Sequence, residues 1–341
     1  MPCGHLYHSK QKHTKQLTNK TEKSDTMKKL HLLLSAALLM IFVACGDDSN
    51  EYNIGGKKGS ETAVQPDDRQ SSGPDIAKYN LEFPALKGGN SVVVVHRGIL
   101  NDKLNKSGVN YSVEWDTEIN AQRWSCYQMY ADNYKTGSQV SRYYSTNDGS
   151  LSADCQYPND PDLPSQYRLT KDPYKGSGFD HGHICPSADR QRANEANYQT
   201  FYITNMQPQN NKFNAGIWAN MENQVRTWAG NFDTLFVCKG GTIDKSEWII
   251  KYLGSGNNRI PVPKYFFMAV LGKKGTSFKA TGFWIPQDSY TSSSIKSYAV
   301  TIQALQNNTG IDFFCNLPDD IENQVENIAH SQMEKEWTWQ Q

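Results

Sequence analysis

The order of strand-like and helix-like segments between Leu81 and Trp337 is the feature that most constrains the fold. Four consecutive valines make 91–96 typical of a buried strand, and the segments 111–116 and 122–131 are expected to be strands as well. Helical segments are interspersed without a regular β-α-β alternation, and no internal repeat or linker divides the region. This mixture favours one domain of the α+β class over a doubly wound parallel sheet.

The rest of this region predicts a long loop followed by mixed elements. Residues 145–178 are rich in Asp, Pro, Ser and Gly and are expected to form the loop, which leads into a short strand at 179–185. Apolar residues recur at helical spacing over 216–228, the most regular helical pattern of the chain. The remaining expected elements are helices at 188–199, 295–306 and 318–329 and strands at 201–206, 234–238, 265–271 and 279–285.

The N-terminal region carries an export signal. Met27 and two lysines precede an almost wholly apolar run, Leu30 to Val43, and the pair Ala44-Cys45 follows it. A basic start, an apolar stretch of this length and a small residue before the cut are typical of a secretory signal. The cysteine after Ala44 resembles the lipobox of bacterial lipoproteins, in which Cys45 would be lipidated. A signal peptide cut elsewhere is the competing interpretation, whereas a membrane-spanning anchor would need ~20 apolar residues.

These features divide the chain into four parts. Residues 1–26 are expected to be a spurious extension before the true start, 27–45 the signal peptide, 46–78 a flexible tether and 79–337 the folded domain. The mature protein would be exported and lipid-anchored in the outer membrane, facing the periplasm or the outside. Five cysteines remain after Cys45, and the sequence leaves their pairing open.

The charge of the chain limits how it could bind nucleic acid. The full sequence has 35 basic and 35 acidic residues, but removal of residues 1–45 leaves 28 and 33, a net charge near −5. An acidic protein is poorly suited to hold long stretches of nucleic acid through bulk charge. Contact with one or two phosphates through a metal and a local basic cluster remains compatible with this composition.

Two histidines and an aspartate lie within four residues in Asp180-His181-Gly182-His183. In an extended segment His181 and His183 share one face, and Asp180 takes the other. Imidazole titrates near neutral pH, so a histidine here could take a proton from water. Two other interpretations stay open: a hydrogen-bonded structural turn, and a zinc site completed by Cys185, although the spacing is too tight for the usual zinc ligand pairs.

A second segment, about twenty residues later, is dense in amide side chains from Asn205 through Gln209 to Asn214. Amide oxygens are hard, neutral ligands that suit magnesium. Asn214 stands where the helix should begin, so helix capping alone could also explain it. Glu222 lies eight residues further, two turns along the helix and on broadly the same side. It is either an exposed helix charge or a carboxylate that holds a water of the metal.

Together these segments resemble the DNA/RNA non-specific endonucleases, a family with a ββα-metal core that includes secreted bacterial nucleases and mitochondrial endonuclease G. The family signature reads Asp-Arg-Gly-His, then Asn-x-x-Pro-Gln, then Asn-x-Gly-x-Trp-x-x-x-Glu. It corresponds here to 180–183, 205–209 and 214–222, and the resemblance extends over 81–337. The resemblance implies an α+β fold with a central, mostly antiparallel sheet flanked by helices, and a hydrolase that cleaves DNA and RNA.

One departure from the signature concerns its second position, where the usual arginine is His181. The chemistry of the family rests on the fourth position, His183, so activity is expected to survive with weaker phosphate or loop contacts. An upstream arginine of the family corresponds to Arg142.

The resemblance also implies a role for each residue. Asn214 would be the direct protein ligand of Mg²⁺, for which Mn²⁺ could substitute, and Glu222 would hold one of the metal's waters. His183 would be the general base, and Asp180 or a backbone carbonyl would set its tautomer. Arg142 would neutralise the phosphate. Supporting contacts to the substrate or the metal shell would come from Asn205, Gln209 and His181.

Two other functions remain as alternatives to this nuclease. One is a phosphodiesterase that acts on small phosphate esters through the same site, and the other is a surface-binding lipoprotein that has lost catalysis. The expected partners of the nuclease are DNA and RNA, the membrane through the N-terminal lipid, and, as an open assembly, a second copy in a homodimer.

Overall fold

The computed structural model describes residues 77–78, 80–131, 139–147, 149–288 and 294–339, which all belong to the unit Pro66–Gln341. The expected signal peptide, Cys45 and nearly all of the tether lie outside the described residues, so these expectations stay predictions. Within the described ranges, no helix has the length and apolar character that crossing a membrane requires.

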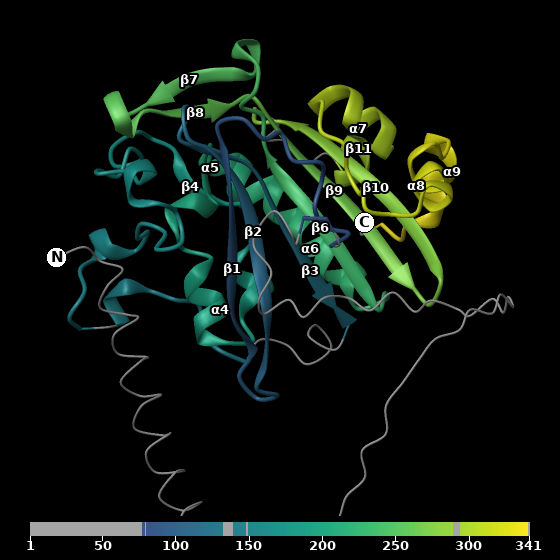
Figure 1. The fold of residues 1–341 in the computed structure, drawn as a ribbon, viewed down its shortest axis with the longest axis horizontal. Coiled ribbons are helices and arrows are strands. Elements are labelled where there is room, and N and C mark those ends of the chain that lie inside the picture. Colours follow the sequence, from purple (N-terminus) through teal and green to yellow (C-terminus); the bar gives the residue numbers. More distant parts are fainter. Residues whose placement is uncertain (1–76, 79, 132–138, 148, 289–293, 340–341) are drawn as a thin grey trace, which may run out of the picture. The chain divides into compact units, whose positions relative to one another are not determined.

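An antiparallel sheet of seven strands forms the centre of the unit (Figure 1). Each pair of neighbouring strands in it runs antiparallel. This architecture confirms the predicted α+β class with a central antiparallel sheet flanked by helices. In spatial order, the strands are β1 (Ser91–Asn101), β2 (Lys106–Asp116), β3 (Ala121–Tyr130), β6 (Thr234–Gly241), β9 (Tyr265–Lys274), β10 (Ser277–Pro286) and β11 (Ala299–Val300).

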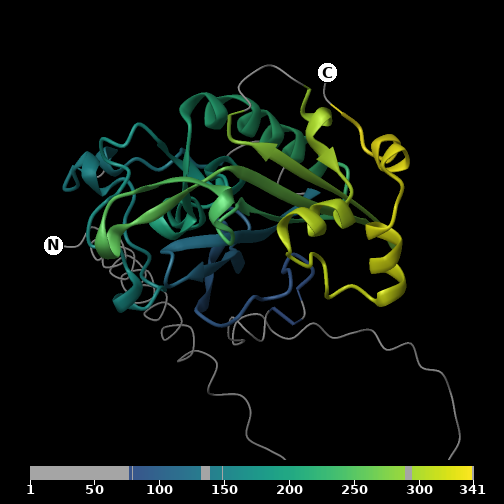
Figure 2. The same ribbon diagram turned by 90° about the horizontal axis from the view of Figure 1, so that it is seen from above.

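Alternating side chains give the sheet two apolar faces. Side chains along β9 alternate between two core clusters. Phe266 and Met268 belong to the first cluster, and Phe267 and Ala269 belong to the second. The first face is covered by α6 (Ala219–Ala229), and the second by α7 (Ile302–Thr309) and α8 (Asp319–Glu326). Figure 2 shows the sheet between the green α6 and the yellow α7 and α8. A sheet covered on both sides is a rigid platform for the unit described next.

A small unit on the α6 side begins with a ribbon of two strands, β4 (Asp180–His183) and β5 (Met206–Gln209). They pair antiparallel, with His183 opposite Met206 and Asp180 opposite Gln209. The chain continues through the short α5 (Asn211–Phe213) and a π-type turn over Asn214–Trp218 into α6. The indole Nε1 of Trp218 donates to the backbone oxygen of His183 at 3.4 Å. This contact ties the start of the helix to the second histidine of β4. The two strands followed by this helix form the ββα core that the resemblance implied.

The Asn205 side chain clamps the end of β4 against the start of β5. Its Oδ1 accepts from the backbone N of Cys185, and its Nδ2 donates to the backbone oxygens of Cys185 and Thr200, each at 2.8 Å. The amide is fully buried, so loss of any of these bonds would leave a buried polar group unpaired. Asn205 therefore fixes the backbone directly after His183.

The remaining elements complete the unit around this framework. A second ribbon, of β7 and β8, stands apart from the main sheet. Its chain reversal spans 254–259 and was not expected from the sequence. The bounds of the elements not yet given are α4 (Asn194–Gln199), β7 (Ile249–Leu253), β8 (Ile260–Pro263) and α9 (His330–Glu336).

Most of the expected elements are confirmed. Most strands of the main sheet are longer than expected, whereas β4 spans only 180–183 of the expected 179–185. The strand expected at 201–206 is wrong: Ile203–Asn205 is a 3-10 turn, and the strand begins at Met206. This apolar run is buried because it packs beneath the ββα unit, and burial alone does not distinguish a strand from a turn.

All four expected helices differ from the structure in extent, and the one expected at 318–329 spans only Asp319–Glu326. The helix of 188–199 is helical only from Asn194, because the buried Arg190 bonds to the backbone of Asn110 and Gln128 and holds the preceding turn. The helix expected at 216–228 begins as an α-helix only at Ala219, because the preceding π-type turn contains Gly216, whose φ of −103° and ψ of −109° are not helical. The one expected at 295–306 starts at Ile302, after the capping Thr301.

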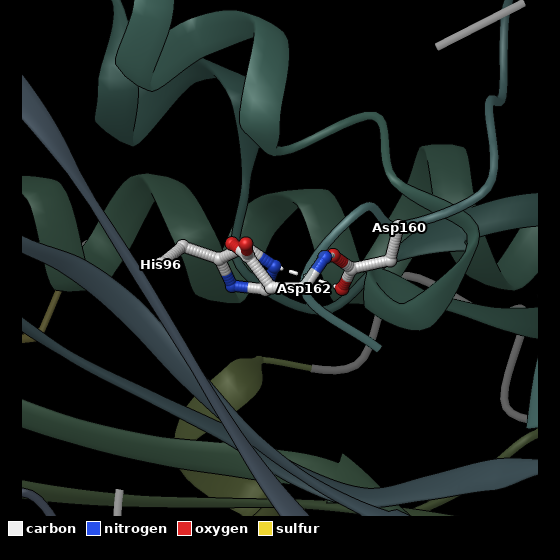
Figure 3. Close-up of side chains that lie close together, drawn as sticks. All are labelled: His96, Asp160 and Asp162. Carbon is white, nitrogen blue, oxygen red and sulfur yellow. Dashed lines mark hydrogen bonds and ion pairs between the residues drawn. The ribbon is translucent and has the colours of Figure 1, made fainter. Parts of the chain in front are cut away.

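A buried ion pair holds the long loop to the sheet (Figure 3). Nε2 of His96, on β1, lies 2.8 Å from Oδ2 of Asp160, and both side chains are fully buried. The Thr204 hydroxyl donates to the same carboxylate oxygen, and the backbone N of Asp162 donates to the other. Burial opposes charge on both groups, but the pairing prevails: it raises the pKa of His96 and lowers that of Asp160. The pair therefore anchors the loop that carries part of the pocket wall.

We expect Asp160→Ala to lower the free energy of unfolding by about 3–5 kcal/mol, because it leaves His96 and Thr204 buried without their partner. The matched control is Asp162→Ala, which removes an exposed carboxylate two residues away and should change stability by less than about 1 kcal/mol. Urea unfolding followed by tryptophan fluorescence measures both. Equal losses in the two variants would contradict the anchoring role of Asp160.

Candidate active site

One pocket of about 430 Å³ brings together six of the residues expected from the sequence. The β4 strand contributes three of them, the start of the helix contributes two, and the segment before the long loop contributes one. Aromatic rings of Tyr157 and Phe179 complete part of the wall. The six residues are Arg142, Asp180, His181, His183, Asn214 and Glu222.

His183 is held in the pocket wall with one ring nitrogen free of partners. Its ring meets the edge of Phe201 at a centroid distance of 4.8 Å and an angle of 84°. Nε2 is buried and makes no hydrogen bond. Burial, and then the nearby charge of Arg142, hold the pKa of His183 well below 6.5. The ring is therefore neutral at physiological pH.

The surroundings of the His183 ring indicate which nitrogen can act as the base. The backbone of His181 favours the protonated ring and so opposes the downward shift in the pKa of His183. Nε2 makes no hydrogen bond and lies in a ring that lines the pocket, so it is the nitrogen that is free to carry the lone pair of a general base. The Asp180 carboxylate is bonded elsewhere.

Asp180 instead organises the amides at the start of the helix. Its Oδ2 accepts from Nδ2 of Asn214 at 2.9 Å and from Nδ2 of Asn211 at 3.1 Å. Because an ionised carboxylate only accepts hydrogen bonds, the amide NH₂ of Asn214 must face Asp180. The amide oxygen of Asn214 is then directed away from this carboxylate and has no hydrogen bond that would occupy it.

Helix capping does not explain Asn214. The cap of α5 is Asn210, whose side chain accepts from the backbone N of Lys212 at 3.0 Å. Asn214 lies inside the turn that follows, where its own backbone N bonds to the Asn210 oxygen. The side chain of Asn214 is thus committed to Asp180 and to the pocket.

The oxygen-rich side of the pocket fits a divalent cation of the magnesium type. Asn214 offers an amide oxygen, and Asp180 and Glu222 offer carboxylates, which are hard ligands. A zinc site with Cys185 does not fit, because burial raises the pKa of that thiol to about 12 and the side chain belongs to the apolar core. Within the described residues, His181 and His183 are in no group of potential metal ligands.

The other histidine-containing cluster, His96 with Asp160 and Asp162, is remote from this chemistry. Both oxygens of Asp160 already accept hydrogen bonds, and none of the three residues lines the pocket. It is a structural ion pair.

Glu222 is paired with a residue that the sequence analysis missed. Nζ of Lys239, on β6, lies 2.8 Å from Oε1 of Glu222, and the lysine is fully buried. Burial raises the pKa of Glu222, and the lysine opposes that shift. The same ammonium lies 4.7 Å from the centroid of a Trp218 ring. A lysine inside an otherwise apolar strand, directly before two glycines, was the available signal for this residue.

His181 is sandwiched between two tyrosine rings. It stacks on Tyr157 at 3.8 Å and on Tyr174 at 4.1 Å, and its Nε2 lies 3.1 Å from both carboxylate oxygens of Asp172. Although burial raises the pKa of Asp172, the hydrogen bond and charge of His181 lower it overall. The position where the family usually has arginine is thus filled by a rigid, partnered imidazole.

Arg142 lines the same pocket and comes from a segment that precedes β4 in the chain. Its guanidinium lies 4.8 Å from the centroid of Phe201, the ring that also meets His183. A guanidinium held on an aromatic face keeps its N–H groups available for an anion. The structure therefore places a cation beside the proposed base.

Asn205 and Gln209 do not line the pocket. Asn205 acts on the backbone after His183, as described above. Gln209 is buried against Gly182, where any Cβ would overlap its side chain, which explains the glycine between the two histidines. Their support of the site is thus indirect.

Comparison with known proteins agrees with this geometry. The sequence profile of the DNA/RNA non-specific endonuclease family matches residues 98–320. Nuclease C1 of Cunninghamella echinulata var. echinulata is 29% identical over 213 residues, which cover 60% of this chain and 80% of that protein. A nuclease of Nostoc sp. is 30% identical over 177 residues, covering 49% and 62%, and bovine mitochondrial endonuclease G is 25% identical over 219 residues, covering 62% and 69%.

A solved structure shares the fold. The crystal structure of the EndoG/EndoGI complex superposes with a TM-score of 0.52 at 21% identity, covering 62% of this chain and 85% of that one. The matched profile spans well over half of the chain and includes each signature segment. The chain belongs to the DNA/RNA non-specific endonuclease family, and with it to the nucleases among the hydrolases.

Proposed function

We propose that this protein hydrolyses phosphodiester bonds of both DNA and RNA with little base preference, in a magnesium-dependent reaction with His183 as the general base. The observation that carries the proposal is the convergence of His183, Arg142, Asn214 and Glu222 on one pocket. A binding protein that had lost catalysis would need none of these four in this arrangement.

Asn214 and Glu222 are the residues proposed to hold Mg²⁺, or Mn²⁺ in its place, with the Asn214 amide oxygen as the direct ligand. When bound, the ion would act as a Lewis acid that stabilises negative charge on the phosphate and the leaving oxygen. Asp180 orients Asn214 for this purpose, and Lys239 holds the Glu222 carboxylate in place.

The residues of the chain divide the remaining work. His183 takes a proton from the attacking water at Nε2, the ring nitrogen that makes no hydrogen bond. Arg142 neutralises charge on the phosphate through its planar guanidinium. Cleavage of the bond to the 3′ oxygen leaves 5′-phosphorylated ends. Because these groups address the phosphodiester and not the base edges, the reaction is largely independent of sequence.

The place of action is also a proposal. We infer from the apolar run before Cys45 that the protein is exported, lipidated at Cys45 and tethered to the outer membrane. Nucleic acid outside the cytoplasm would then be its substrate.

We expect His183→Ala to lower the rate of plasmid and RNA cleavage by about 10²- to 10⁴-fold, because it removes the proton acceptor. A chelator should abolish cleavage by the wild-type protein, and added Mg²⁺ should restore it. The matched control is His181→Ala, whose Nε2 is already bound to Asp172 and which should lose less. Wild-type rates in a folded His183→Ala protein would refute the assignment of the base.

The acid limb of kcat/KM should lie well below pH 6.5. His183 acts as a base only when neutral, and its pKa is depressed, so activity falls only as the pH drops through that lowered value. Arg142→Gln removes one cause of the depression and should move the limb to higher pH while lowering the rate. Lys212→Gln, an exposed lysine on α5, is the control and should leave the limb in place. A limb that does not move in Arg142→Gln would contradict this electrostatic coupling.

The metal ligand can be tested with two neighbouring asparagines that donate to the same oxygen of Asp180. Asn214→Ala should raise the Mg²⁺ concentration needed for half-maximal thermal stabilisation by about tenfold or more, since it removes the direct ligand. Asn211→Ala breaks the equivalent bond to Asp180 but lies outside the pocket lining, so it should change that concentration little. Equal shifts in both variants would show that only Asp180 matters.

A further inference from the structure

The hairpin of β7 and β8 reaches the rim of the active-site pocket. Nζ of Lys251, on β7, lies 4.7 Å from the centroid of the Phe179 ring. Phe179 lines the pocket and directly precedes Asp180. The ammonium of Lys251 therefore contacts a ring of the pocket wall, although it comes from an element about seventy residues later in the chain.

The hairpin is fixed in this position by packing and by hydrogen bonds. Its buried Leu253 and Val262 share an apolar cluster with Tyr174, the ring that stacks on His181. At its turn, Oδ1 of Asn258 accepts from the backbone N of Thr170 at 2.7 Å and of the following residue at 2.9 Å. Figure 1 shows β7 and β8 directly beyond β4 and α5. The hairpin is a rigid extension of the site.

The outer face of the hairpin exposes apolar and aromatic groups. Ile250 is 53% exposed and Tyr252 is 40% exposed, and the guanidinium of Arg259 lies 3.5 Å from the centroid of the Tyr252 ring. Tyr144, two residues after Arg142, is 50% exposed. Three of the four large apolar side chains found exposed among the described residues thus belong to segments next to the pocket. Groups of this kind mark interaction surfaces.

The cations of the hairpin have no acidic partner among the described residues. Neither Lys251 nor Arg259 forms an ion pair there, whereas Lys239 and Arg226 are paired with carboxylates. Both hairpin cations rest on aromatic faces, which hold them in place while leaving their charge available. Since those faces are already covered, phosphates suit this surface better than stacked bases.

We propose that Lys251 and Arg259 bind the phosphodiester backbone of the nucleic-acid strand next to the bond that is cleaved. The proposal rests on the nuclease function and adds a polymer-binding surface outside the reacting pocket. It explains how a chain with as many acidic as basic residues can hold a polyanion, because the cations that matter are local and have no acidic partner among the described residues.

The test measures binding separately from cleavage. In the full-length His183→Ala protein with Mg²⁺, the affinity for a fluorescent 20-nucleotide single strand is followed by anisotropy over a range of salt concentrations. We expect Lys251→Gln with Arg259→Gln to weaken binding about tenfold near 0.1 M salt. The slope of log affinity against log salt should become shallower by about 0.7 per lost phosphate contact, about 1.4 in total, equally for different base sequences.

Lys106→Gln is the matched control. Its Nζ also rests on an aromatic ring, Tyr130, at 4.3 Å, but it begins β2, at the far end of the β1–β2 hairpin from β7 and β8 in Figure 1. It should leave both affinity and slope unchanged. An unchanged slope in the double variant, an equal change in Lys106→Gln, or a loss confined to one base sequence would overturn the proposal.

Activity measurements separate failure of this proposal from failure of the nuclease function. On a wild-type His183 background, the double variant should lose kcat/KM on long DNA and retain it on bis(p-nitrophenyl) phosphate, which reaches only the pocket. If the wild-type protein cleaves neither substrate, the nuclease function fails while the binding result still stands. If it cleaves both and the double variant cleaves both equally well, the hairpin proposal alone is refuted.

Discussion

The pairing of β4 with β5 is the constraint on which the site depends. It sets Asp180 opposite Gln209 and His183 opposite Met206, and the chain then turns directly into the helix that carries Asn214. Asn205 locks the end of this ribbon through three buried hydrogen bonds. Because the strands and the helix are fixed to one another, a base from β4 and oxygen ligands from the helix meet in one pocket without help from a flexible loop.

Burial converts these ordinary side chains into a site with distinct protonation states. It keeps His183 neutral and raises the pKa of Glu222, while Lys239 beneath the helix opposes the change at Glu222. The buried carboxylate of Asp189 near the site is likewise paired, with Arg226. Local placement of charge reconciles a chain of zero formal net charge with a polyanionic substrate.

The pocket residues could be predicted from the sequence because each lies in a short segment with its own signal. Eight residues were named for the pocket and its support; six of them line one pocket, whereas Asn205 and Gln209 do not. The role of Asp180 was left open by the sequence, since only the structure separates bonding to Asn214 from bonding to His183. The sequence analysis considered Asn214 as the helix cap, but the capping residue is Asn210. The difference arises because the sequence does not mark the first residue of a helix clearly.

The features that sequence reasoning missed depend on contacts between distant segments. Lys239 meets Glu222 only because β6 runs under α6, and Asp172 and Tyr174 meet His181 only because the long loop folds back over β4. The turn of the β7–β8 hairpin, residues 254–258, is rich in Gly, Ser and Asn, which are typical of turns, but this composition does not indicate that the hairpin packs against the site. Gly216 interrupts the most regular helical pattern, because periodic apolar residues do not report a local π-type turn.

The central claim is that His183 is a neutral base with its lone pair on Nε2. Long-range ¹H–¹⁵N NMR of the imidazole groups, with His183 assigned by comparison with His183→Ala, measures its tautomer and its pKa together. The account predicts a protonated Nδ1, an unprotonated Nε2 and a midpoint well below 6.5. A proton on Nε2 at neutral pH, or a midpoint at or above 6.5, would contradict it.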